Sequence, residues 1–313
     1  MSRRHHLASL ALVTAVTLTA AGCGADSDPL AGGSDDGAAA GADAGAVAIG
    51  SANFPESELL AEIYAQALED EGVEVERSFN IGARELYLQA LQDGSIDLLP
   101  EYNGALLSAL TEGGAPEDVS DSEEVYEALP AVLPEGTVVL EQSEAEDKDT
   151  LTVTQETADE YDLETLADLE PVAGELVVGA GPEWQERYQG LPGLQEVYGL
   201  QFAEFRPLDS GGPLTVGALL DGTIDVANIF STDSSIEQND LVVLEDPENL
   251  FLAENIVPLI RESAATPTVV DALDEVSAAL TTENLTEYLA KVQVDRQDTA
   301  TVATEFLEEY DLV

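Results

Sequence analysis

The chain has little cysteine, histidine or positive charge. Its 313 residues include one Cys and two His, and ten Lys and Arg stand against 64 Asp and Glu, a formal net charge of −54. A single Cys excludes an internal disulfide. A phosphate backbone is bound by basic patches, which this composition cannot supply, so we expect no nucleic-acid partner. A hydrophobic content of 44% nevertheless provides for a folded core.

The N-terminus has the pattern of an export signal. Arg3 and Arg4 precede an apolar stretch over residues 7–19, which is too short for a stable membrane-spanning helix. Small residues and then Cys23 follow, as in a bacterial lipobox. We predict a lipoprotein signal peptide over residues 1–22 and lipidation of Cys23, which would anchor an extracytoplasmic protein to the outer face of the cell membrane. An ordinary secretory signal with a chance cysteine is the alternative.

Residues 23–46 are mostly Gly, Ala, Ser and Asp, and they predict a flexible acidic tether. Both histidines lie in the signal peptide, at positions 5 and 6. Its removal would leave eight basic residues, 64 acidic residues and no histidine. A Ser-His-Asp triad, a Cys-His pair and a His-ligated zinc site are thereby excluded, and no metal or other cofactor is expected.

Two sequence features suggest a hydrolase only superficially. Residues 209–213, Asp-Ser-Gly-Gly-Pro, look like the nucleophile segment of chymotrypsin-like proteases, but the serine has no histidine as general base. We interpret this segment as a glycine-rich turn that enters a helix. The many acids favour a solvated surface suited to high salt. A secreted hydrolase that uses paired carboxylates stays open as the alternative function.

The body of the chain contains an internal echo. Residues 90–98 (ALQDGSIDL) recur as residues 218–226 (ALLDGTIDV), 128 positions later. In each copy a helix is predicted to end at Gly94 or Gly222, a strand to begin at Ile96 or Ile224, and a loop to follow. Two such units predict an α/β protein with two lobes of similar build.

Apolar periodicity predicts further elements around this echo. Strands are expected at residues 47–50, 151–154, 176–179, 241–244 and 255–260, and helices at residues 56–71, 269–280 and 285–292. Because ligands of open α/β sheets bind beyond the carboxyl ends of strands, candidate ligand residues should directly follow these strands.

Several segments of the body resemble a known family. They are residues 49–54 (IGSANF), 94–104 (from Gly94 to the Pro-Glu-Tyr-Asn-Gly run), 179–183 (GAGPE), 208–214 (LDSGGPL) and 240–244 (DLVVL). Together they resemble the glycine betaine/choline/carnitine-binding lipoproteins of osmoprotectant ABC importers, over about residues 47–312. The run Pro100 to Gly104 is the most specific part of the resemblance.

The resemblance implies an α/β, two-lobed type II periplasmic-binding-protein fold with two interlobe crossovers and a central cleft. Lobe 1 would comprise residues 47–148 and 253–313, and lobe 2 residues 149–252. The protein would not be an enzyme. As a monomer, it would capture a quaternary-ammonium osmoprotectant and deliver it to an ABC permease that works with a cytoplasmic ATPase.

A trimethylammonium head has no N–H donor, so aromatic faces and negative charge must hold it, whereas a ligand carboxylate favours Arg or helix-start amides. By resemblance, Tyr102 matches a cage tyrosine and Arg187 a carboxylate-binding arginine. Trp184 and Phe230 follow predicted strands, and Tyr87 is a further aromatic that the cage could recruit.

The remaining candidates stand where the family carries other residues: Asn53 in the first loop, and Asp149, Thr215 and Asn239 at cage-tyrosine positions. Asp149 could serve as an anionic partner for the cation.

Overall fold

A computed structural model describes residues 46–116 and 119–313 of the protein. The predicted signal peptide, Cys23 and all but the last residue of the predicted tether lie outside these residues. Within the described part of the chain, no helix has both the length and the hydrophobicity that a bilayer crossing requires.

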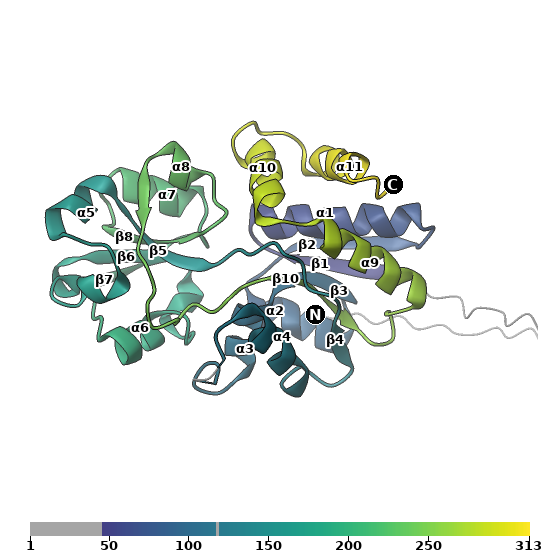
Figure 1. Ribbon diagram of the computed structural model, residues 1–313, viewed down its shortest axis with the longest axis horizontal. Helices are drawn as coiled ribbons and strands as arrows, with labels where there is room; N and C mark the ends of the chain where they lie inside the picture. The colour runs from purple at the N-terminus through teal and green to yellow at the C-terminus, as the bar shows by residue number, and fades with distance from the viewer. Residues whose placement is uncertain (1–45, 117–118) are drawn as a thin grey trace, which may run out of the picture. The chain divides into compact units, whose positions relative to one another are not determined.

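The first of two five-stranded sheets has the order β2-β1-β3-β10-β4 (Figure 1). β1 runs parallel to β2 and β3, whereas β10 is antiparallel to β3 and β4. The strands are β1 (Val47–Ala52), β2 (Val75–Gly82), β3 (Leu98–Tyr102), β4 (Thr137–Val139) and β10 (Ile256–Arg261).

The second sheet repeats this plan with the order β7-β6-β8-β5-β9. β6 is parallel to β7 and β8, and β5 is antiparallel to β8 and β9. The strands are β5 (Asp149–Thr154), β6 (Val177–Ala180), β7 (Glu204–Pro207), β8 (Val226–Phe230) and β9 (Leu241–Val243). In each sheet, therefore, one strand runs antiparallel to the other four: β10 in the first sheet and β5 in the second.

The sequence echo occupies equivalent places in the two sheets. Asp97, just before β3, exchanges hydrogen bonds with Ala48 of β1: the Ala48 amide donates to the Asp97 carboxylate at 3.0 Å. Asp225, just before β8, does the same with Val177 of β6, at 2.7 Å. The recurring Ile-Asp pair thus joins two neighbouring parallel strands in each sheet, which confirms the predicted pair of similar α/β units.

Two extended segments carry the chain between the sheets. The chain leaves the first sheet after β4 and returns to it at β10. The two crossover segments pair with each other through an antiparallel bridge between Glu146 and Asn255, and the Asp147 amide donates to the Glu254 carbonyl at 3.1 Å. Figure 1 shows them running side by side. Residues on these segments therefore hold fixed positions at the junction of the sheets.

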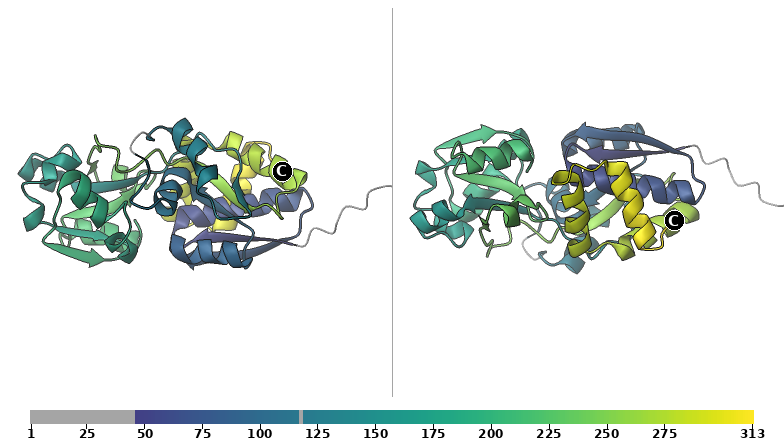
Figure 2. Two further views of the ribbon diagram at one scale, coloured as in Figure 1. Left: turned by 90° about the horizontal axis from the view of Figure 1, so that it is seen from below. Right: turned by 90° about the horizontal axis from the view of Figure 1, so that it is seen from above.

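Helices cover both faces of each sheet. On the first sheet, α1 packs against β1 and against the C-terminal helices α9, α10 and α11 (Figure 2). The first sheet's helices are α1 (Pro55–Asp70), α2 (Arg84–Asp93), α3 (Asn103–Leu110), α4 (Ser122–Ala128), α9 (Pro267–Ala279), α10 (Thr282–Gln293) and α11 (Thr299–Glu309). Those of the second are α5 (Gln155–Tyr161), α6 (Leu191–Tyr198), α7 (Pro213–Leu220) and α8 (Ser235–Gln238).

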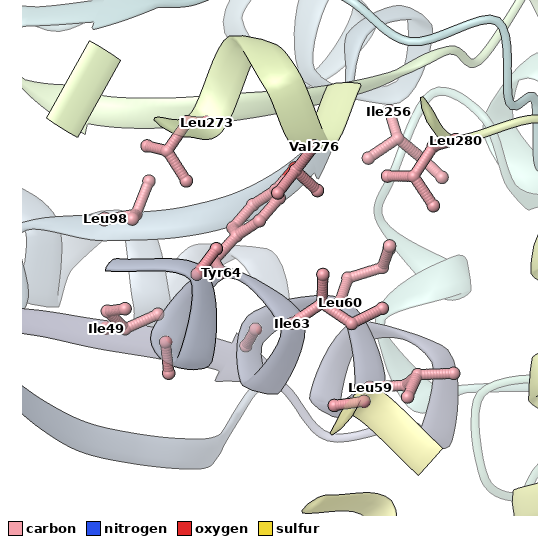
Figure 3. Packing of buried hydrophobic residues seen from close by; sticks show 14 of the residues in the cluster. Ile49, Leu59, Leu60, Ile63, Tyr64, Leu98, Ile256, Leu273, Val276 and Leu280 are labelled. Atoms are coloured by element: carbon pink, nitrogen blue, oxygen red, sulfur yellow. The ribbon is translucent and has the colours of Figure 1, made fainter. Parts of the chain in front are cut away.

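The largest hydrophobic core lies between the first sheet and the helices α1 and α9. Tyr64 and Leu60 of α1 pack there with Leu98 of β3 and Val276 of α9, all fully buried (Figure 3). The spacing of apolar residues on α1 places one face of the helix on the sheet. This core fixes β3 and the start of α1, the two elements that bring Tyr102 and Phe54 to one place.

Most of the predicted strands and helices are confirmed within one or two residues at each end. The strands of the echo differ from expectation: they begin at Leu98 and Val226, two residues later than predicted, and extend through Tyr102 and Phe230. Both aromatics therefore end strands instead of lying in loops. Several elements had not been predicted, among them β2, β4, β7 and α11. No residue of β2 is buried, so no buried pattern marks it.

Gly104 lies where α3 touches the second crossover, and a Cβ there would stand 2.3 Å from the Ala253 carbonyl oxygen. We predict that Gly104→Ala lowers the unfolding free energy by about 1–3 kcal/mol, because the backbone must move apart. Gly217 in α7 has no atom within 4 Å of its Cβ position, so Gly217→Ala should instead stabilise the helix by up to about 1 kcal/mol. Urea unfolding at fixed salt measures the change in unfolding free energy of each variant. Equal changes in Gly104→Ala and Gly217→Ala would contradict this packing.

Candidate functional site

A narrow pocket lies where the ends of β3 and β8 meet the crossover segments. Its cavity volume is about 50 Å³. The lining residues are Ala52, Asn53, Phe54, Ala83, Arg84, Tyr87, Tyr102, Ala105, Asp147, Asp149, Glu183, Trp184, Arg187, Ser210, Asn228, Phe230 and Glu254.

Aromatic side chains from both sheets form the walls of the pocket. Tyr102 ends β3 and Phe230 ends β8, at positions 128 residues apart that the internal echo makes equivalent. Phe54 stands between them: its ring centroid is 6.0 Å from that of Tyr102 and 5.0 Å from that of Phe230. Tyr87 of α2 and Trp184, which is buried against Phe251, add two further rings.

A buried ion pair fixes two of these rings. Glu101 has no exposed surface, and Arg84 donates to its two carboxylate oxygens at 2.8 and 3.0 Å. The Tyr87 hydroxyl and the Tyr102 amide also donate to this carboxylate, each at 2.8 Å. With four donors, the buried charge of Glu101 is compensated. The network holds α2 and the end of β3 in one arrangement at the pocket.

A second network of buried acids links the two sheets. Glu56, in the first turn of α1, accepts from the Tyr102 hydroxyl at 2.8 Å and from the Thr232 hydroxyl at 2.5 Å. Asp147, whose pKa the negative charge of Glu56 raises, accepts from the Thr232 amide at 3.0 Å. Burial raises the pKa of both carboxyl groups. Each carboxyl group is therefore protonated more readily than it would be in water.

Two more acids lie on or beside the crossovers. Asp149 accepts from the Asn228 side chain at 2.7 Å, and Glu254, which is almost fully buried, accepts from Gln189 at 3.2 Å. Burial raises the pKa of each, and the negative charge of Asp149 raises the pKa of Glu254 further. The positive charge of Arg84 opposes the shift in both groups.

Arg187 follows β6 and reaches across to the other sheet's helix α2. Its guanidinium donates to the two carboxylate oxygens of Glu85 at 2.9 and 3.0 Å, and Glu183 lies 4.0 Å away. The side chain also lines the pocket. Arg187 is thus placed at the pocket and already bound to acids.

The structure brings six of the seven candidate ligand residues to one pocket: Tyr102, Arg187, Trp184, Asn53, Asp149 and Phe230. Thr215 lies apart from them, inside α7. Its hydroxyl donates to Asp209, the residue whose carboxylate also accepts from the Leu214 and Thr215 amides. Asn239, at another expected cage position, donates to the Ser235 carbonyl and does not line the pocket.

Sequence reasoning did not single out several lining residues, foremost Asp147, Glu254, Arg84 and Phe54. Phe54 ends the resembling segment at residues 49–54, and Arg84 is one of few basic residues, so both carried a usable signal. Asp147 and Glu254 lie on crossovers without periodicity in a chain with 64 acids, and nothing in the sequence distinguishes them.

The segment from Asp209 to Pro213 is the expected glycine-rich turn at the start of α7. Ser210 donates to Glu183 at 2.7 Å, which gives the serine a structural hydrogen bond at the edge of the pocket. Among the residues that the structure describes, no three His, Cys, Asp or Glu side chains are placed to hold a metal ion. What the pocket offers is enclosure by aromatic rings and negative charge.

Two similar sheets joined by two crossovers, with a pocket at the junction, define the class of two-lobed substrate-binding proteins. Residues 45–309 match the family described as the substrate-binding domain of ABC-type glycine betaine transport systems. The chain belongs to this family.

Individual relatives agree with this assignment. The chain is 26% identical over 277 residues to the glycine betaine-binding protein YehZ of Escherichia coli, covering 84% of this chain and 90% of the relative. It is 25% identical over 270 residues to the carnitine transport binding protein OpuCC of Listeria monocytogenes, covering 84% and 86%.

Among solved structures, a glycine betaine/carnitine/choline ABC transporter protein matches with a TM-score of 0.64 at 22% identity, over 85% of this chain and all but 1% of that one. A choline-binding protein in complex with choline matches with a TM-score of 0.63 at 15% identity, over 86% and 89%. These matches confirm the predicted type II periplasmic-binding-protein fold. The family confirms the predicted substrate-binding role in ABC transport, and the hydrolase alternative finds no support.

The raised pKa of Asp147 predicts a pH-dependent stability. Unfolded Asp is ionised above about pH 4, whereas burial favours the protonated form in the fold, so folding takes up a proton and stability falls as pH rises from about 4. Asn has no carboxyl proton to lose, so Asp147→Asn removes this pH-dependent loss of stability. We expect the variant to be more stable than the parent at pH 7 and to lose this advantage below about pH 4.

Thermal unfolding between pH 3.5 and 8 measures this difference. The exposed acid Glu275 in α9 provides the control, since Glu275→Gln removes one charge without removing a buried carboxyl group. A stability difference for Asp147→Asn that stays constant over the whole pH range would contradict a raised pKa.

Proposed function

We propose that this protein captures a quaternary-ammonium osmolyte, such as glycine betaine or choline, outside the cytoplasm. It delivers the ligand unchanged to an ABC permease that is driven by a cytoplasmic ATPase. The observation that carries the proposal is the pairing of Tyr102 and Phe230 at the ends of equivalent strands, with Phe54 between them and buried acids behind. Tyr102, Arg187, Trp184, Asn53, Asp149 and Phe230 would contact the ligand.

The chemistry of the walls supports a methylated ammonium. Such a cation donates no hydrogen bond and is attracted to aromatic faces within about 6 Å and to negative charge. The named relatives bind glycine betaine or carnitine, both of which carry such a head.

The ligand would be enclosed by movement of the lobes about the crossovers. We propose residues 47–148 and 253–313 as one lobe and residues 149–252 as the other. Several contacts join them; among them, Thr232 donates to Glu56, Gln293 to Asp233 and Arg187 to Glu85. Ligand contacts from both lobes would favour the closed arrangement, and the permease would favour release. Capture and release need no covalent step, so the protein would act as a monomeric receptor without catalysis.

Calorimetric titration with glycine betaine, choline, carnitine and proline betaine tests the ligand class. We expect heat of binding and a higher unfolding temperature with at least one of them, since a ligand that binds the fold stabilises it. An absence of heat and of any thermal shift with all four would contradict the proposal.

Tyr102→Ala tests the wall of the pocket. Loss of the cation–π contact should weaken binding by about 0.5–2 kcal/mol. Tyr102→Phe is the matched control, because it keeps the ring and removes only the hydroxyl that donates to Glu56, so it should bind more tightly than the Ala variant. Calorimetry measures both affinities. If the parent and Tyr102→Ala bind the ligand equally tightly, Tyr102 does not contribute to the binding site.

Membrane attachment through Cys23 is proposed from the sequence pattern of residues 1–23 alone. Cys23→Ser removes the thiol that would carry the lipid, so the variant should no longer partition into the detergent phase when producing cells are extracted with Triton X-114. The parent should partition there. Equal partitioning of the two proteins would contradict the anchor.

A further inference from the structure

We infer that Gln293, the last residue of α10, is a positioning residue that sets how slowly the closed protein releases its ligand. Gln293 is not among the residues that line the pocket. It would act from outside the pocket, by holding a loop of one proposed lobe onto a helix of the other. The inference rests on the proposed function, because it assigns a residue to lobe closure.

The contact consists of two hydrogen bonds that use both ends of one amide group. The Gln293 nitrogen donates to Asp233 at 3.1 Å, and the Gln293 oxygen accepts from the Ser234 hydroxyl at 3.3 Å. An ionised carboxylate only accepts hydrogen bonds, so the amide nitrogen must face Asp233 and the oxygen is left for the hydroxyl. The second carboxylate oxygen of Asp233 accepts from the Ser235 amide at 2.7 Å. The contact is therefore directional, and it would be lost when the lobes part.

The loop that Gln293 holds, residues 231–234, leads directly from the wall of the pocket. Phe230, which ends β8, accepts through its carbonyl from the Asp233 amide at 3.0 Å. Thr232 in the middle of the loop is buried and donates to Glu56 of α1. The loop is thus bound to the first proposed lobe at two points, one on α1 and one on α10.

A small second cavity shows how close this contact lies to the aromatic wall. Its volume is about 10 Å³, and Phe54 and Phe230 line it together with Gln293. The same two rings line the binding pocket on their other side. Gln293 therefore lies behind the wall of the pocket, where it can hold the wall in place without touching the ligand.

A contact of this kind slows ligand release more than it affects ligand entry. If the hydrogen bonds form only when the lobes close, they stabilise the closed arrangement and leave the open one unchanged. The ligand then enters at the same rate and leaves more slowly. In a chain with 64 acids and ten basic residues, neutral donors such as this amide can join the lobes where Lys and Arg are scarce.

Binding kinetics of Gln293→Ala test the inference, with glycine betaine and choline as the probes. Trp184 is the one tryptophan of the chain and lines the pocket, so stopped-flow fluorescence can follow binding, and calorimetry gives the affinities. We expect the dissociation rate to rise about tenfold, as for the loss of a hydrogen bond to a charged group. The association rate should change by less than about twofold.

Two further variants separate this role from a general loss of polar contacts. Thr286→Ala also truncates a polar side chain of α10, but its hydroxyl donates to the Thr282 carbonyl within the same helix. It should leave both rates unchanged. Gln293→Glu keeps the shape of the side chain and places a carboxylate against Asp233. Because like charges repel, it should release the ligand faster than Gln293→Ala does.

A double-mutant cycle tests whether Gln293 acts through Asp233. Asp233→Asn keeps an oxygen for the Ser235 amide and presents a donor, in place of an acceptor, to Gln293. In this background Gln293→Ala should change the affinity by less than about twofold. A purely structural role of Gln293 would weaken binding equally with and without the Asp233 carboxylate.

Each outcome decides between the inference and the proposed function. Unchanged release from Gln293→Ala, or an equal loss of affinity in the Asp233→Asn background, would overturn the inference and leave the proposed function standing. A slower association with an unchanged dissociation rate would also overturn it. If the parent protein binds none of the named osmolytes, both are overturned.

Discussion

The arrangement of the pocket depends on the buried carboxylate of Glu101. A charge with no exposed surface must be matched by donors, and four of them come from Arg84, Tyr87 and the backbone of Tyr102. Removing one partner of such a pair typically costs about 3–5 kcal/mol. This requirement locks the start of α2 to the end of β3, and the aromatic walls take their positions from that constraint.

Two buried acids connect this aromatic wall to the second sheet. Glu56 connects Tyr102 of the first sheet to Thr232, which follows β8 of the second, and Asp147 on the first crossover completes the group. The family's transport role accounts for such a site. A receptor that must close and reopen benefits from polar contacts between its lobes, because these can exchange with water when the lobes part.

The sequence predicted what local patterns encode. The echo at residues 90–98 and 218–226 combines helix ends with buried strands, so two similar units could be anticipated. Tyr102 and Phe230 were expected in the loops after the strands, whereas both lie at the strand ends. The acids of the crossovers could not be anticipated, because Asp147 and Glu254 lie in segments without periodicity and are hidden among 64 acids. The cage positions at Thr215 and Asn239 rested on alignment alone. The structure gives both side chains hydrogen bonds within the second lobe.

A crystal structure of the protein with a bound quaternary ammonium tests the central claim most directly. The account predicts the nitrogen within about 6 Å of the ring centroids of Tyr102 and Phe230, with the Arg84–Glu101 pair intact beneath it. A ligand whose nitrogen lies away from both rings, or a ligand carboxylate that has replaced Glu101 on Arg84, would contradict it.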